Sequence, residues 1–300
     1  MYINKDTTIL IQGITGKEGQ RATQRMINYG SNVVAGVRPG KAGETVLDVP
    51  VYNTVKDAIA AEGTIDATAI YVPPFAAKAA IIEAIEAGVK LITCVVERVP
   101  IKDTAECLEL AKLHGVTIIG PTSFGVMKPG VGRLGVIGGP VELVDEIYTP
   151  GNIGIISRSG GMTNELSWQV KKHGLGQSTV IHVGGDLLMG TTYADILKKF
   201  QKDDQTKGVI LFGEHGGSYE FEIVDIIKSG KFSKPLVVYV GGKFANTLPE
   251  GMHIGHAGAI VEKGKGAKEK KEALESVGVT VVDRYEELVP QIKKLINHND

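Results

Sequence analysis

The sequence predicts an α/β fold with two parallel sheets. Short runs that are apolar throughout alternate with longer amphipathic stretches along almost all of the 300 residues. Strands without a polar face are typical of parallel sheets that helices cover on both sides. The 39 glycines are nearly twice the usual share of about 7%, and they cluster after the apolar runs. Such clusters indicate several loops that face a ligand rather than one flexible linker.

The first domain is predicted over residues 1–121. Its strands are expected at residues 8–13, 32–37, 68–74, 90–97 and 116–121. Its helices are expected at residues 17–30, 54–63, 76–88 and 103–115. All four helical stretches end at a glycine, namely Gly30, Gly63, Gly88 and Gly115, and glycine is the residue that most often ends a helix. This alternation indicates a doubly wound parallel domain.

The second domain is predicted over residues 122–300. It begins with the glycine-rich stretch 122–140, which we expect to be an irregular crossing between the domains. Strands are then expected at residues 152–157, 178–186, 208–214, 235–242 and 279–283. Helices are expected at residues 162–174, 192–202, 219–230, 268–278 and 285–296. This number of alternating elements favours a flavodoxin-like parallel domain.

Composition excludes several classes of function. A net charge of −1 gives no basic field for nucleic acid, and no apolar run is long enough to span a membrane. The N-terminus lacks the pattern of a signal peptide. Cys94 and Cys107 are expected to be buried thiols, and no Cys/His cluster has metal-ligand spacing. We therefore expect a cytoplasmic protein that needs no metal site of its own.

The first strand-to-helix turn carries Gly13, Gly16 and Gly19. Glycines let the backbone approach phosphate oxygens, and the following helix offers free N–H groups at its positive end. The spacing is G-x-x-G-x-x-G and not the dinucleotide pattern G-x-G-x-x-G. After the second strand come Arg38 and Lys41 instead of an acidic residue for a ribose hydroxyl. This combination favours a phosphate-rich ligand such as coenzyme A over NAD, and a structural turn beside a basic loop is the alternative.

Three glycine-rich strand ends are predicted on one edge of the second sheet. The stretch "SRSGG" places Ser157, Ser159, Gly160 and Gly161 where a helix begins, so that hydroxyl and N–H groups can hold an anion. An ordinary helix cap is the alternative, but it needs only one serine. The stretches "VGGD" and "FGEHGG" end two further strands, and the second places Glu214 before paired glycines. A carboxylate there can orient an imidazole, or it can simply be solvated.

His256 stands in "GMHIGHAGAI", a tract with few side chains around it. The tract is either a surface turn with a solvated histidine or a place where something large approaches the imidazole. An imidazole can accept a phosphoryl group and hold it as phosphohistidine. Surrounding glycines leave room for the phosphate, and helix N-termini stabilise its charge. With "SRSGG" and Glu214 on the same edge, we interpret His256 as the phosphorylated residue.

Together these motifs resemble the α subunit of the succinyl-CoA synthetases, a family of nucleoside-diphosphate-forming acyl-CoA synthetases. The resemblance covers nearly the whole chain. It is carried, in order, by QGITGKEG, GVRPGKAG, VPVYNTVKDA, IYVPPF, IIGP, SRSGG, GGD, GEHGG and GHAGAI. The combination is specific, although each motif alone is weak.

The resemblance implies a Rossmann-like first domain that binds coenzyme A. The implied contacts are Gly13, Thr15, Gly16, Lys17, Glu18, Gly19, Lys41, Tyr71, Val72, Pro73, Val96 and Glu97. It also implies that His256 is phosphorylated, that Glu214 is its partner and that the "SRSGG" helix start binds the phosphohistidine. The phosphoryl group then passes to an organic acid, and the acyl phosphate reacts with the CoA thiol.

The resemblance further implies an ATP-grasp β subunit that holds ATP or GTP with Mg²⁺, in a heterodimer or a heterotetramer. Some positions depart from the family pattern. Thr122 and Ser123 replace an asparagine and a cysteine, and Arg98 replaces a glycine. Asn164 stands where succinate enzymes commonly have a tyrosine. In this respect the stretch resembles ATP-citrate lyase and citryl-CoA synthetase. Ser123 and Asn164 are therefore candidate contacts to the acid.

Three functions stay open at this point. An acid–CoA ligase subunit comes first, with succinate as the leading acid and citrate as the alternative. A nicotinamide-dependent oxidoreductase is disfavoured because the expected acidic residue is missing. A CoA-responsive regulatory protein without catalysis is disfavoured by the presence of His256, Glu214 and "SRSGG" together.

Overall fold

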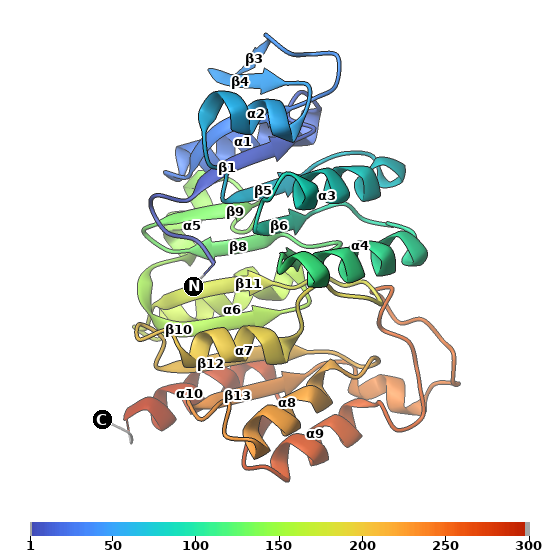
Figure 1. Ribbon diagram of the computed structural model, residues 1–300. Coiled ribbons are helices and arrows are strands. Elements are labelled where there is room, and N and C mark those ends of the chain that lie inside the picture. The colour runs from blue at the N-terminus through green and yellow to red at the C-terminus, as the bar shows by residue number, and fades with distance from the viewer. Residues whose placement is uncertain (1, 298–300) are drawn as a thin grey trace. The chain divides into compact units, whose positions relative to one another are not determined.

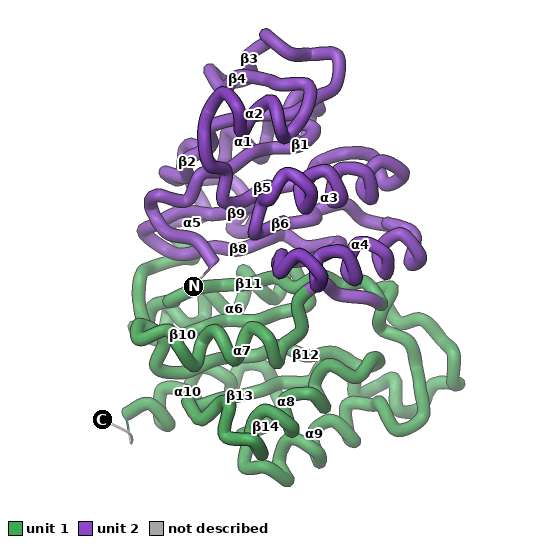
Figure 2. Tube along the Cα trace, viewed as in Figure 1, with its two compact units in different colours: residues 1, 146–187, 191–300 green, residues 2–145, 188–190 purple. Residues whose placement is uncertain are grey.

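Parallel strands and helices alternate through residues 2–297, which are the residues that this computed structural model describes (Figure 1). The predicted α/β fold class is confirmed. Contacts divide the chain into two compact units (Figure 2). The N-terminal unit comprises residues 2–145 and 188–190, and the C-terminal unit comprises residues 146–187 and those from 191 onward. No helix in the described part of the chain is long and apolar enough to cross a membrane.

The N-terminal unit is a sheet with the strand order β3-β4-β2-β1-β5-β6-β7. The strands are β1 (Thr8–Gln12), β2 (Asn32–Val37), β3 (Thr45–Val46), β4 (Val49–Tyr52), β5 (Ala67–Ile70), β6 (Leu91–Cys94) and β7 (Thr117–Ile119). The helices are α1 (Lys17–Asn28), α2 (Val55–Glu62), η1 (Pro74–Ala76), α3 (Ala77–Glu86) and α4 (Ile101–His114). All pairs are parallel except the hairpin β3–β4. The order reverses at β1, and such a reversal is where doubly wound sheets bind ligands.

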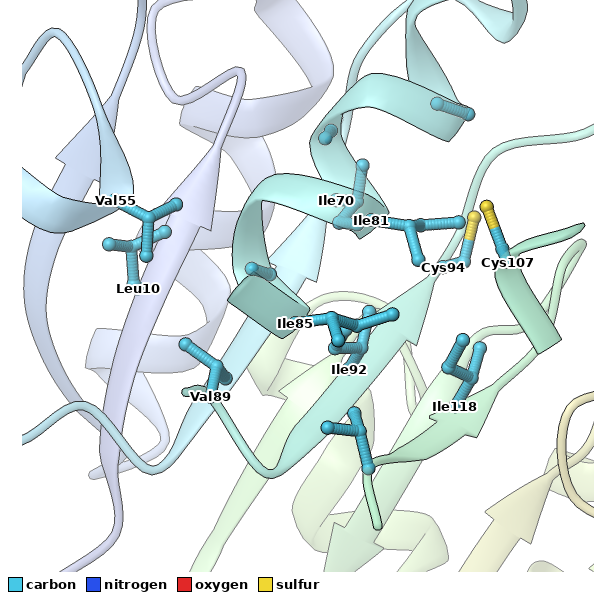
Figure 3. Close-up of a cluster of buried hydrophobic side chains, with 14 of the residues drawn as sticks. Leu10, Val55, Ile70, Ile81, Ile85, Val89, Ile92, Cys94, Cys107 and Ile118 are labelled. Carbon is cyan, nitrogen blue, oxygen red and sulfur yellow. The ribbon is translucent and has the colours of Figure 1, made fainter. Parts of the chain in front are cut away.

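The core of this unit lies between the sheet and the helices that cover it. Figure 3 shows side chains from β1, β5, β6 and β7 packing against residues of α2, α3 and α4. Strands that are apolar on both faces supply Leu10, Ile70 and Ile92, each fully buried. Cys94 and Cys107 are both buried thiols outside any disulfide, which confirms the prediction for the two residues.

A short antiparallel hairpin follows the last strand of this sheet. It is formed by β8 (Gly125–Lys128) and β9 (Gly132–Gly135), and α5 (Val141–Ile147) comes after it. The expectation that residues 122–140 form an irregular crossing was therefore wrong. The buried Arg133 side chain donates to the backbone oxygens of Arg25, Ile137 and Gly139, and the bond to Arg25 ties the hairpin to α1. The compact units divide after Asp145, and the domain boundary at residue 121 stays a prediction.

The C-terminal unit contains five parallel strands in the order β14-β13-β12-β10-β11. They are β10 (Pro150–Ser157), β11 (Gln177–His182), β12 (Gly208–Gly213), β13 (Leu236–Val240) and β14 (Thr280–Val282). The helices are α6 (Gly160–Lys172), α7 (Tyr193–Gln201), α8 (Tyr219–Lys228), η2 (Lys243–Thr247), α9 (Ala267–Glu275), η3 (Tyr285–Glu287) and α10 (Leu288–Asn297). β10 lies between β11 and β12, so the order reverses there as well. The loops after these three strands therefore share one edge.

Candidate functional site

His256 lies at the tip of a narrow loop, residues 251–261. Backbone hydrogen bonds cross the loop from Gly251 to Val261, from Val261 to Met252 and from Ile254 to Ala259. Gly255, next to the tip, has φ +115° and no atom near the position of a side chain. A left-handed backbone favours glycine, so this residue lets the chain turn while leaving one side of the histidine uncovered.

The imidazole of His256 is held by the carboxylate of Glu214, directly after β12. His256 Nδ1 lies 2.9 Å from Glu214 Oε1 and 2.8 Å from Oε2. Among residues 2–297, His256 Nε2 makes no hydrogen bond, and 36% of the side chain is exposed. Because an ionised carboxylate only accepts hydrogen bonds, Nδ1 carries the proton when the ring is neutral, and Nε2 then carries the lone pair. The ring thus presents a nucleophilic nitrogen toward open space.

The contact between His256 and Glu214 shifts the pKa values of both residues. The hydrogen bond to Glu214 raises the pKa of His256 above its ordinary value, although burial acts in the opposite direction. Burial opposes ionisation of Glu214, but the hydrogen bond and charge of His256, with the charge of Arg158, together lower the pKa of its carboxyl. The pair therefore favours an ionised carboxylate beside the imidazole.

Glycines leave space for the ring and for a buried cation next to it. A Cβ at Gly185, after β11, would lie 2.7 Å from His256 Cδ2, so a side chain there would displace the imidazole. A Cβ at Gly258 would lie 2.2 Å from Arg158 Nη2. Arg158 Nη2 donates to the backbone oxygen of Asp186 at 2.9 Å, and no carboxylate in the described part of the chain forms an ion pair with Arg158. Its positive charge is thus available to an anion at the histidine.

The start of α6 supplies hydroxyl and N–H groups. Ser159 is the N-cap, and its Oγ accepts from the N–H of Met162. Ser157 is fully buried, and its Oγ donates to the backbone oxygen of Ser159, so its hydroxyl shapes the turn. Gly160 and Gly161 form the first two helical positions, where N–H groups have no intrahelical partner. A Cβ at Gly161 would meet nothing within 4 Å, so packing alone does not require a glycine there.

A cavity of about 310 Å³ joins these elements within the C-terminal unit. It is lined by Ser159, Phe212, Glu214, His215, Gly241, Gly242, Phe244, Ile254, Gly255, His256 and Ala259. Of the predicted phosphate and histidine residues, Ser159, Glu214 and His256 therefore meet in one cavity. A concave site with a held imidazole beside a helix N-terminus can transfer a phosphoryl group.

One charged side chain close to His256 was not predicted from the sequence. Arg158 lies inside "SRSGG" but was not chosen, because nothing in the sequence shows that a charged residue after a strand turns inward. His215 is 2% exposed, and neither ring nitrogen has a hydrogen-bond partner within residues 2–297. Burial, and next the charge of Lys270, lowers its pKa, so the ring is neutral near pH 7. The position of His215 next to Glu214 in the sequence predicts a supporting place near the site, and His215 does line the cavity.

The two candidate contacts to the acid lie elsewhere. Asn164 is in α6, and its Oδ1 accepts from the hydroxyl of Tyr148 at 2.7 Å. It does not line the cavity around His256. Ser123 is fully buried in the N-terminal unit, where its Oγ accepts from the N–H of Gly125. Their assignment to the acid stays a prediction.

A larger cavity of about 740 Å³ lies in the N-terminal unit, at the reversal of strand order. It is lined by Gly13, Thr15, Gly16, Lys17, Glu18, Arg38, Ile70, Tyr71, Val72, Pro73, Pro74, Val95, Val96, Glu97 and Arg98. All the predicted cofactor contacts except Gly19 and Lys41 are among them. Gly19 packs on the turn instead, since its Cβ would lie 2.3 Å from the Gly13 oxygen, and Lys41 pairs with Glu44 at 2.7 Å.

The chemistry of this cavity fits a phosphate-rich ligand. A Cβ at Gly13 would lie 2.4 Å from the backbone oxygen of Tyr71, so only glycine lets the turn lie against β5. The turn leads into the N-terminus of α1, and Lys17, Arg38 and Arg98 supply positive charge at the walls. Backbone N–H groups, a helix dipole and cations are the groups that hold phosphates.

Fold and cavities together define a class of protein: a parallel α/β protein with one phosphate-binding unit and one unit that presents a carboxylate-held histidine. Comparison with known proteins gives the family. Residues 4–98 match the CoA binding domain, and residues 156–281 match the CoA-ligase domain. The chain is 45% identical over 283 residues to the ADP-forming succinate–CoA ligase subunit alpha 2 of Archaeoglobus fulgidus, which covers 94% of both chains. It belongs to the family of CoA-ligase alpha subunits.

Other relatives differ in the acid that their names give. The chain is 40% identical over 285 residues to an ADP-forming sulfoacetate-CoA ligase subunit of Acholeplasma sp, with 95% of this chain and 94% of the relative covered. Its fold also matches that of ATP citrate lyase from Methanothrix soehngenii in complex with citrate and coenzyme A. That match has a TM-score of 0.92 at 24% identity and covers 99% of this chain. The chain spans about half of the citrate lyase chain, 51%.

Proposed function

We propose that this chain is the alpha subunit of a nucleoside-diphosphate-forming acid–CoA ligase and that His256 carries the phosphoryl group between two half-reactions. The observation that carries the proposal is the contact of 2.8 Å and 2.9 Å between Nδ1 of His256 and the Glu214 carboxylate. It orients the ring, fixes the proton on Nδ1 and leaves Nε2 as the nucleophile.

In the first half-reaction, Nε2 of His256 attacks the terminal phosphorus of a nucleoside triphosphate. The N–P bond forms as the bond from phosphorus to the nucleoside diphosphate breaks, and Glu214 offsets the positive charge that develops on the ring. The N-terminus of α6, with the N–H groups of Gly160 and Gly161, and the positive charge of Arg158 would stabilise the added negative charge. In the second half-reaction a carboxylate oxygen of the acid takes the phosphoryl group, and the ring returns to its neutral form.

In the last step the thiol sulfur of coenzyme A attacks the acyl carbon of the acyl phosphate. The C–S bond forms as the C–O bond to the phosphate breaks, and inorganic phosphate leaves. We assign coenzyme A to the cavity of about 740 Å³, where the turn from Gly13 to Gly19 and the N-terminus of α1 hold its phosphates. The match of residues 4–98 to the CoA binding domain supports this assignment.

The nucleotide requires a second polypeptide. The relatives are named as alpha subunits, which supports a β partner for this chain. We propose an ATP-grasp β subunit that holds ATP or GTP with Mg²⁺, in a heterodimer or heterotetramer.

Succinate is the first candidate acid, because the relatives with 41–45% identity include several named succinate–CoA ligase subunits. Citrate is the alternative. The "SGGMTNE" stretch with Asn164 supports it, as does the fold match to ATP citrate lyase. A sulfoacetate-CoA ligase subunit among the relatives adds a third anion to be tested.

The phosphorylation step is tested by labelling. The chain, co-purified with its ATP-grasp partner, is incubated with γ-labelled ATP or GTP and Mg²⁺. We expect one acid-labile, base-stable phosphate per chain and none in His256→Asn, because asparagine has no ring nitrogen to accept the phosphoryl group. Label that survives in His256→Asn would contradict the assignment. Absence of label in the wild type would favour a CoA-responsive protein without catalysis.

The acid is identified with the same complex and CoA. Succinate, citrate, malate and sulfoacetate are compared by kcat/KM for thioester formation. We expect succinate to exceed the others by at least about tenfold, a difference of about 1.4 kcal/mol in transition-state binding. Thioester from citrate with none from succinate would replace succinate by the alternative.

A further inference from the structure

Two oppositely charged side chains are buried beneath the loop that carries Glu214. Glu220 is in the first turn of α8 and Lys270 is in α9, and these helices lie side by side (Figure 1). Lys270 Nζ lies 2.6 Å from Glu220 Oε2, and the two side chains are 0% and 1% exposed. Burying two charges is costly, and apolar residues of similar volume often replace such pairs without loss of stability. The pair is therefore a weak device for stability alone.

The other polar groups of the pair all bind one short loop. Glu220 Oε1 accepts from the backbone N–H of Glu214 at 3.1 Å. Lys270 Nζ donates to the backbone oxygen of Glu214 at 2.7 Å and to that of Gly216 at 2.5 Å. The ammonium group of Lys270 thus makes two hydrogen bonds to this loop in addition to its ion pair with Glu220. Both backbone groups of Glu214 are thus fixed by the ion pair.

Glycines confine the loop on its other sides. A Cβ at Gly213 would lie 2.7 Å from Glu220 Oε1, so the carboxylate fits closely under the strand end. A Cβ at Gly216 would lie 2.7 Å from the backbone nitrogen of Ile260, in the loop that carries His256. The Glu214 loop is therefore enclosed between the ion pair below and the His256 loop beside it.

We propose that Lys270 and Glu220 are positioning residues that hold Glu214 in place, so that its carboxylate stays against Nδ1 of His256. The inference rests on the proposed phosphohistidine function and adds to it. The side chain of Glu214 makes its described hydrogen bonds only with His256, so its position depends on where its backbone is held. Displacement of about 1 Å at a reacting group can cost about 100-fold in rate.

The deciding variant removes both charges at once. Glu220→Gln with Lys270→Met leaves no unpaired buried charge, so we expect it to fold. It keeps an acceptor for the Glu214 N–H and removes both bonds from the lysine. The matched control is Lys234→Met in the same unit. Lys234 Nζ also donates to two backbone oxygens, those of Phe200 and Asp203, both at 2.7 Å, but on a different loop.

Two readouts separate positioning from stability. The rate of label transfer to His256 should fall by about 10- to 100-fold in the double variant and stay within about twofold in Lys234→Met. The pKa of His256, followed by NMR on the complex and on this chain, should fall toward its ordinary value in the double variant only. Loss of folding stability alone would not move the pKa of the folded protein.

Wild-type rate and an unchanged His256 pKa in the double variant would overturn the proposal. If circular dichroism shows that this variant does not fold, Glu220→Gln with Lys270→Gln decides in its place, since it also leaves no unpaired buried charge and keeps a polar group at both positions. A lower rate and a lower His256 pKa support positioning, and wild-type values overturn it. Failure of the proposed function gives a different result: no label on the wild type, with the NMR titration still reporting on the positioning.

Discussion

The contact between His256 and Glu214 links the chemistry of the site to pH. The stabilisation of the fold that comes from the raised pKa of His256 is fully present below the ordinary imidazole pKa of 6.5. It is lost as pH rises through the raised pKa of His256 in the folded protein. The stabilisation that comes from the lowered pKa of Glu214 is present above the ordinary carboxyl pKa of 4.5. It is lost as pH falls through the lowered pKa of Glu214 in the folded protein. The contact therefore stabilises the fold most between these two ordinary values.

We predict that Glu214→Gln destabilises the chain most between pH 4.5 and 6.5, and less above the raised pKa of His256. Because the His256 side chain is 36% exposed, the loss near pH 5.5 should be only about 1 kcal/mol. Urea unfolding of both proteins at pH 5.5 and pH 9 measures it. The midpoint of the pH profile for phosphorylation should also shift to lower pH. Without the Glu214 carboxylate the pKa of His256 falls, so the neutral, nucleophilic ring forms at lower pH. An equal loss of stability at both pH values would contradict this account.

At this scale the sequence predicted which side chains meet but not what surrounds them. Glu214 and the "SRSGG" turn follow neighbouring strands, so their proximity follows from the parallel topology. Arg98 and Thr122 were noted only as departures from a family pattern. Both have left-handed backbones, with φ of +59° and +56°, where glycine and asparagine are favoured. A single sequence does not reveal backbone strain of this kind.

Among the elements, the buried strands and long helices could be predicted and the short hairpins could not. Apolar runs identify β1, β5, β6 and β12, since nearly all of their residues are buried. The hairpin β3–β4 was missed because its two-residue turn, Leu47 and Asp48, contains no glycine. The hairpin β8–β9 was missed because glycines within its strands read as a loop, whereas they allow close backbone approach.

The first of these hairpins can be stabilised. Leu47 and Asp48 have φ of +54° and +63° between the paired residues Val46 and Val49, which is the pattern of a type I′ turn. A leucine in the left-handed region costs about 1–2 kcal/mol, whereas asparagine tolerates it. We predict that Leu47→Asn raises the unfolding free energy by about 1 kcal/mol and Tm by about 2 °C.

Leu143→Asn is the control for that substitution. Both leucines are exposed, at 42% and 47%, but Leu143 lies in helix α5 without a positive φ. Asparagine lowers helix propensity, so Tm should fall slightly there. Calorimetry of the two variants compares them directly, and a loss of stability at both positions would mean that the turn is not strained.

In the molecule as a whole, the two units share one arrangement of strand order and ligand-facing turn, but their sites differ in chemistry. In both units (Figure 2) the strand order reverses at the first long parallel strand, and a glycine turn leads from it into a helix. The N-terminal turn opens on a cavity of about 740 Å³. The C-terminal turn opens on a cavity of about 310 Å³ with the histidine. The topology predicted where both sites lie, but the cavity volumes depend on packing that no pattern reveals.

We therefore predict that His256→Asn leaves CoA binding intact. All residues that line the larger cavity belong to the N-terminal unit, and His256 belongs to the other. Isothermal titration of CoA into the wild type and the variant should give Kd values within about twofold, a difference below about 0.4 kcal/mol. Gly16→Leu, which fills the phosphate turn, is the control and should abolish binding. Loss of binding in His256→Asn would mean that the two sites are not separate.

The loop of residues 251–261 has a mechanical consequence. Hydrogen bonds across the loop connect the backbone on the two sides of His256. A large displacement of His256 therefore requires that the whole loop moves as one body. Within residues 2–297, movement of this loop away from the site would break the main-chain hydrogen bond from the Gly258 nitrogen to the Gly185 oxygen, 3.0 Å long, and the contact between His256 and Glu214. Gly251 stands at the start of the loop and Gly264 follows its end. Both have a positive φ and no atom within 4 Å of the Cβ position, so the backbone can rotate there as hinges for this movement.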